Sequence, residues 1–144
     1  ITEKKPYPSL IRLLNHSDFV VIRRSIASIN NILLGGSYSS SFNQPHPHFQ
    51  AVASCGGINK LYSLFKKNEF EKITILSALC IGQLFEAKEI SNVTMRIDVV
   101  TYFKAEFAGF DELNKKSAKY VLGLLAKNSV NRVEIEKDGF KIPE

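Results

Sequence analysis

The chain has 144 residues, of which 44% are apolar and 23% are charged, and it carries a formal net charge of +5. This is the length of about one domain, and its apolar content can form a core, which excludes a wholly disordered chain. The basic excess favours acidic partners, but it lies below the charge density typical of nucleic-acid-binding domains. The sequence has no apolar run near the roughly 20 residues of a membrane-spanning helix. It begins at Ile1 without a leader pattern, from which we expect a soluble piece of a longer protein.

A first helix is predicted directly after Pro6 and Pro8, because proline is tolerated in the first turn of a helix and excluded from its interior. Its apolar residues fall at helical spacing over positions 10–14. After a short loop, Ser17 or Asp18 is expected to cap the next helix by accepting its free backbone N–H groups.

A second, amphipathic helix is predicted from Phe19 to Leu34, because apolar residues recur there at intervals of three and four. Gly35 and Gly36 are interpreted as its C-terminal cap. The stretch 37–47 is rich in serine, asparagine and proline, so we expect an exposed loop. Tyr38 to Ser41 is a candidate phosphorylation target on the ground of that exposure.

The stretch 48–85 predicts three successive helices. A short one covers 48–55, a second covers the leucine-spaced run 58–65, and a third covers 70–85. Gly56 and Gly57 separate the first two helices, and Asn68 lies between the second and the third. This is the most regular part of the chain.

Apolar positions of this stretch recur elsewhere in the sequence. An offset of 51 residues aligns Leu10 with Leu61 and Phe19 with Phe70, while an offset of 40 aligns Phe70 with Phe110 and Ala78 with Ala118. Without the serine-rich loop, both offsets approach the roughly 40 to 47 residues of helical repeats. Residues 131–142 align with the start of the unit again, and Gly139 aligns with Gly57.

The residues resemble an armadillo repeat protein, whose unit is a short helix, a Gly-Gly bend, a second helix and a longer third helix. The resemblance is strongest in HFQAVASCGGINKLYSLF and extends over about residues 8–142. It implies an all-α fold, a right-handed α-α superhelix of about three repeats in a single domain 1–144. The units are 8–46, 47–90 and 91–127, with a further unit starting at 128–144. The connection 88–107 lacks paired glycines and is closer to the HEAT variant of this architecture.

The family's peptide-binding members carry a tryptophan and, four residues later, an asparagine on the third helix. This chain has no tryptophan, and only the first unit has the asparagine, at Asn31. The tryptophan positions hold Ala27, Ala78 and Ala118, and the other two asparagine positions hold Gly82 and Leu122. The chain therefore lacks the groups with which nuclear-import adaptors hold basic peptides.

In such a stack the third helices line a concave face, since each repeat buries its apolar side against its neighbours. The polar residues of these helices are the candidate contacts with a partner protein or peptide, and their net charge is positive, which favours an acidic partner. They are Arg23, Arg24, Asn30, Asn31, Thr74, Lys115, Lys116 and Lys119.

No motif in the sequence indicates catalysis, a metal or a cofactor. His46 and His48 have no third donor nearby, and the glycine pairs lack the spacing of a phosphate-binding loop. Cys55 and Cys80 fall in apolar helical patterns, so we interpret both as small buried residues in a reducing compartment. We expect a protein that is not an enzyme.

The sequence predicts a non-catalytic scaffold of the cytoplasm or nucleus that binds a partner along its concave face. One alternative is a purely structural segment of a longer solenoid, whose isolated fragment self-associates through its ends. Another is a weakly basic surface for nucleic acid, in which affinity would fall steeply with salt. Acidic residues interspersed with the lysines make nucleic acid the weaker alternative.

Overall fold

The computed structural model describes residues 6–38 and 43–144. Within these residues the protein is all-helical and has no β-strand. The elements are α1 (Tyr7–Leu13), α2 (Phe19–Tyr38), α3 (Phe49–Ser54), α4 (Gly57–Lys67), α5 (Glu71–Leu84), α6 (Val93–Ala108), α7 (Glu112–Leu125), α8 (Ser129–Glu136) and the short 3-10 helix η1 (Lys137–Gly139).

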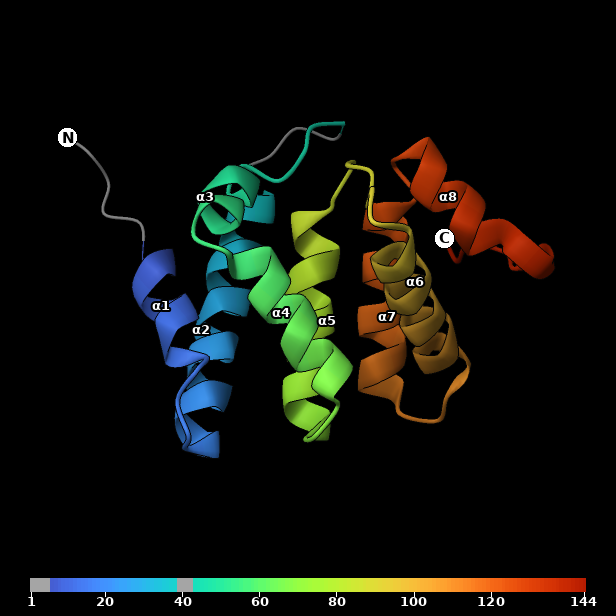
Figure 1. The fold of residues 1–144 in the computed structure, drawn as a ribbon. Helices are drawn as coiled ribbons and strands as arrows, with labels where there is room; N and C mark the ends of the chain where they lie inside the picture. The colour runs from blue at the N-terminus through green and yellow to red at the C-terminus, as the bar shows by residue number, and fades with distance from the viewer. Residues whose placement is uncertain (1–5, 39–42) are drawn as a thin grey trace.

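The main helices form two layers (Figure 1). Helices α2, α5 and α7 lie side by side in one layer, and α1, α4 and α6 lie in front of them. The three helices of the rear layer run in the same direction, and each is antiparallel to the front helix that precedes it in the chain. Helix α8 contacts α6 and α7 at one end of the array.

Helix α5 forms the centre of the core because it is apolar on nearly all sides. It contacts α4 in front, α2 on one flank and α7 on the other. Gly82 allows the close contact with α7, since a Cβ atom there would collide with the side chain of Val121. Cys80 is fully buried against α2, and burial raises the pKa of its thiol.

The three helices predicted in 48–85 are confirmed as α3, α4 and α5. Gly56 has a left-handed backbone, with φ of 74°, at the bend between α3 and α4. Asn68, at the end of α4, is also left-handed, with φ of 46°. The predicted cap at Asp18 is confirmed as well, because its Oδ1 accepts the N–H of Val20 at 2.8 Å.

Two sequence-based expectations around the loop 37–47 were wrong. Helix α2 does not end at Leu34 but continues through Gly35 and Gly36 to Tyr38. His46 is 3% exposed, because its Nε2–H donates to the Leu33 carbonyl at 2.7 Å and its Nδ1 accepts the N–H of His48 at 3.0 Å. Gly36 serves close packing against these two histidines rather than capping. The proposed phosphorylation sites at 39–41 lie outside the described residues.

The two sequence offsets align one pair of residues that are in contact in the structure and one pair that have different environments. The rings of Phe19 and Phe70, aligned by the first offset, lie 4.5 Å apart between centroids. Phe110, aligned with Phe70 by the second offset, is 101% exposed. It precedes Asp111, the N-cap of α7, whereas Phe70 is itself the N-cap of α5. This shift by one residue removes Phe110 from the apolar face.

The adjacent glycines of α2 give a stability prediction. Gly35→Ala raises the free energy of unfolding by about 0.5–1 kcal/mol, because it adds helix propensity and an added Cβ has no atom within 4 Å. Gly36→Ala lowers it by about 1–3 kcal/mol, because the Cβ would lie 2.7 Å from Cε1 of the buried His46. Urea denaturation of both variants checks this, and equal effects at the two positions would contradict it.

Candidate functional site

The predicted partner-binding residues of α2 lie on one helix but differ in their environment. Arg24 and Asn31 are exposed and Arg23 is half-buried. Asn30 is directed at α5, where its Oδ1 accepts a hydrogen bond from Gln83 Nε2 at 2.6 Å. Asn30 is therefore a contact within the fold rather than a free group for a partner.

Two other predicted partner-binding residues, Thr74 and Lys115, make contacts near the start of their own helices. Thr74 is 4% exposed, and its hydroxyl lies 3.0 Å from the Phe70 carbonyl and 3.1 Å from Asn68 Oδ1. It borders a hollow that α4 and α6 form, on the front side of α5. Lys115 forms an ion pair with Glu112 at 3.8 Å in the first turn of α7. Neither Thr74 nor Lys115 lines the cavity described next.

Lys116 and Lys119 are brought together at a cavity of about 780 Å³. Its walls are α7, the segment 126–132 and the C-terminal residues 142–144, and Asn43 contributes from the loop before α3. We call it the basic cavity. Its lining residues are Asn43, Lys116, Lys119, Tyr120, Gly123, Leu124, Ala126, Lys127, Arg132, Ile142, Pro143 and Glu144.

Four of these lining residues are cations and one is an acid. Arg132 pairs with Glu136 at 3.3 Å, with both side chains about half exposed, so this pair is weakened by solvent. Lys116 and Lys119 are exposed and have no ion-pair partner within the described residues. The positive charge at the opening therefore comes mainly from Lys116 and Lys119, with Glu144 as the one acidic lining residue.

The floor of the basic cavity is apolar. Leu124 and Ala126 are each 7% exposed, and Tyr120 is 40% exposed. Gly123 leaves open space beside the last turn of α7, because a Cβ added there would have no heavy atom within 4 Å. Ile142 of the C-terminal segment packs against the hydrophobic core at the opposite wall. Such a surface can bury an apolar side chain while cations surround it.

A buried ion pair fixes the rim of the basic cavity. Lys127 Nζ donates to Glu86 Oε2 at 2.6 Å, and their side chains are 18% and 4% exposed. Glu86 follows α5, and the N–H of the next residue, Ala87, donates to the Leu124 carbonyl at 3.2 Å. The other oxygen, Glu86 Oε1, is buried without a hydrogen-bond partner among the described residues. Lys127 is thereby held in place, and the end of α7 is attached to the end of α5.

The histidines of the loop before α3 serve the fold in this structure. Tyr7 Oη lies 2.6 Å from His48 Nδ1, which joins α1 to the loop, and His46 is bound to α2 as described above. Burial lowers the pKa of His46, with its bond to Leu33 and the charge of Glu86 acting in the opposite direction. Across residues 6–38 and 43–144, no cluster of three or more His, Cys, Asp or Glu residues could hold a metal ion.

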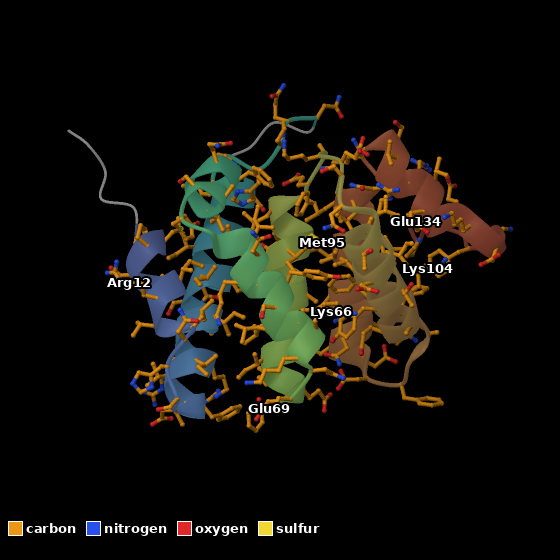
Figure 2. All side chains as sticks on the ribbon, viewed as in Figure 1. Arg12, Lys66, Glu69, Met95, Lys104 and Glu134 are labelled. Carbon is orange, nitrogen blue, oxygen red and sulfur yellow. The ribbon has the colours of Figure 1, made fainter. Side chains whose placement is uncertain are left out.

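A second charged contact joins α4 to α6 on the front of the molecule. Lys66 Nζ and the Tyr62 hydroxyl both donate to Asp98 Oδ2, at 2.9 Å and 2.6 Å. Lys66 is labelled on α4 in Figure 2. The hydrogen bonds from Tyr62 and Lys66 lower the pKa of Asp98. Burial, the larger cause, and the hydrogen bond to Asp98, the smaller one, together raise the pKa of Tyr62 to about 12. Tyr62, Lys66 and Asp98 bind one another in this contact, so we interpret it as a connection between the two helices.

Sequence analysis missed most of the basic cavity, including Tyr120, Gly123, Lys127 and Arg132. One signal was present: residues 116, 120, 123 and 127 are spaced at four, three and four, so they lie along one side of α7. The opposite wall comes from residues 142–144, and its proximity to α7 depends on α8 and η1. That proximity cannot be deduced from local patterns.

Comparison of the chain with protein-family models, with curated proteins and with solved structures gave no match. None of the helices in the described part of the chain is long and apolar enough to cross a membrane. The assignment of the site therefore depends on the residues of this chain alone.

The Glu86–Lys127 pair gives a prediction for the rim. Lys127→Ala lowers the free energy of unfolding by about 3 kcal/mol, because it leaves the buried Glu86 carboxylate without its counter-charge. Lys67→Ala is the control: Lys67 pairs with Glu69 at 2.9 Å, but both side chains are at least half exposed, so its loss costs at most about 1 kcal/mol. Chemical denaturation measures both, and similar losses for the two variants would contradict the assignment.

Proposed function

We propose that this chain is a non-catalytic protein-interaction module that binds an acidic segment of a partner protein in the basic cavity. The observation that carries the proposal is the pairing of an apolar floor with four cations, of which Lys116 and Lys119 have no ion-pair partner in the described structure. A segment with one apolar side chain between carboxylates complements both parts.

The physical basis is a division of roles between the two parts of the cavity. Burial of one aromatic side chain on the floor supplies most of the affinity, because fully desolvated anchors dominate binding energies. The exposed lysines contribute less to affinity, but they steer an acidic segment towards the opening and disfavour a basic one. This division predicts selectivity for charge pattern together with a requirement for the apolar anchor.

We further propose that the helices form an armadillo-like, right-handed superhelix, with the rear layer as its partner-binding face. The support is that α2, α5 and α7 lie adjacent and run in one direction (Figure 1). Arg24 and Asn31 on α2 would then extend the contact beyond the basic cavity. The free thiols Cys55 and Cys80 support a reducing compartment, the cytoplasm or nucleus.

A second candidate function is a structural one, in which the array stacks on further helices of the same protein. Apolar side chains at both ends of the array favour it. Val133 on α8 is 64% exposed, and Leu13 on α1 is 40% exposed. An isolated fragment with such ends would self-associate by end-to-end stacking.

Binding of a synthetic acidic peptide tests the proposed function. A capped, fluorescein-labelled peptide of sequence EEDFEE is expected to bind with a dissociation constant on the order of 100 µM by fluorescence anisotropy. Lys116→Glu with Lys119→Glu lowers its affinity at least about tenfold. A peptide with serine in place of phenylalanine loses a similar factor, because the anchor is absent.

Two matched controls separate the basic cavity from general charge. Lys67→Glu with Lys72→Glu, at two exposed lysines outside the cavity lining, changes the net charge by the same amount but leaves the affinity within about threefold. Gly123→Leu fills the cavity and weakens binding, whereas Gly35→Leu, also in a helix with open space at the Cβ, does not. Equal losses in both charge variants, or no effect of Gly123→Leu, would contradict the proposed site.

A further inference from the structure

The turn between α6 and α7 exposes two large apolar side chains. Phe110 is 101% exposed and Leu113 is 69% exposed, the largest values among the exposed apolar residues of the described chain. Single exposed apolar residues are common on protein surfaces, but a fully exposed phenylalanine beside an exposed leucine forms a projecting apolar group. We call residues 110–113 the apolar knob.

The apolar knob also carries two carboxylates. Asp111 and Glu112 lie between Phe110 and Leu113 in the sequence. Asp111 Oδ1 accepts the N–H of Asn114 at 2.9 Å as the N-cap of α7, which leaves its second oxygen available. Glu112 is 80% exposed, and its 3.8 Å contact with Lys115 is weak in solvent. The knob is therefore an apolar group flanked by acids on a defined turn.

We propose that the apolar knob of one copy of this chain binds in the basic cavity of a second copy. The inference rests on the proposed function, since it uses the same cavity and names one occupant for it. Phe110 supplies the anchor for the floor at Gly123 and Leu124. The carboxylates of Asp111 and Glu112 meet the cations Lys116 and Lys119.

The geometry makes this contact intermolecular. Phe110 lies 13 residues before Gly123 in the chain, and at 1.5 Å per helical residue this is roughly 20 Å along α7. The ring of Phe110 therefore cannot reach the floor at Gly123 in its own chain. The two surfaces are different patches of the molecule, so copies can associate reciprocally in a two-fold dimer or head to tail in a longer assembly.

A contact of this size is weak and transient. One aromatic anchor and a few exposed ion pairs form an interface well below the roughly 1,200 Å² of stable complexes. The chain is thus monomeric when dilute, with the cavity open to a partner. At high local concentration, self-association competes with the partner for the same cavity.

Sedimentation equilibrium of the chain tests the inference. The weight-average mass is expected to rise above that of the monomer between about 10 µM and about 1 mM. A knob variant, Phe110→Ser with Leu113→Ser, and a cavity variant, Lys116→Glu with Lys119→Glu, each lower the association constant at least about tenfold. Phe110, Leu113, Lys116 and Lys119 are all exposed, so the substitutions do not disturb the core. Circular dichroism checks that both variants retain their helices.

Mixing the two variants is decisive. The knob variant keeps an intact cavity and the cavity variant keeps an intact knob, so an equimolar mixture forms a 1:1 dimer and nothing larger. A wild-type chain that stays monomeric, or a mixture that stays monomeric while the wild type associates, would overturn the inference. Association that survives in the cavity variant also overturns it and favours end-to-end stacking instead.

The peptide EEDFEE distinguishes this inference from the proposed function. If the knob variant binds the peptide as the wild type does and the wild type does not self-associate, the inference fails and the proposed function stands. If the peptide does not bind to either protein, the proposed function fails. If the peptide binds and also dissociates wild-type assemblies, both are supported through one cavity.

Discussion

The burial of α5 on nearly all sides is the constraint on which the rest of the structure depends. A helix without a polar face is stable only when other helices cover it, and here α4, α2 and α7 do so. The polar side chains on α5 therefore need partners within the fold. Gln83 Nε2 donates across the layer to Asn30, while the hydroxyl of Ser77 donates to the Ile73 carbonyl of α5 itself. Gly82 brings α7 close enough for Val121 to fill the space at that contact.

The basic cavity follows from that constraint. Because α7 is held against α5 by the side that bears Val121, the residues on its other side are directed away from the core. The Glu86–Lys127 pair and the Ala87–Leu124 hydrogen bond then fix the ends of both helices. The cavity is thus built beside a buried contact between two helices, while Lys116 and Lys119 remain exposed at its rim.

The apolar pattern was sufficient to predict the helices and much of the core, because helical periodicity is local. It located α2, α4 and α5 and identified Cys80 as buried. It was wrong for Gly36, since a glycine inside a helix and a glycine that caps one look alike in sequence. It did not find the cavity, because that depends on residues 142–144 returning to α7. The same repeat pattern placed Thr74 among the surface contacts, although the structure buries it.

The most direct test of the central claim is a ¹H–¹⁵N spectrum of the labelled chain titrated with the acidic peptide. If the basic cavity is the binding site, saturable shifts concentrate at the amides of Lys116, Lys119, Tyr120 and Gly123. Amides beside Asp98, on the front of the molecule, remain unchanged. Shifts spread evenly over all lysine-bearing helices, or shifts confined to α3 and α6, would contradict the account.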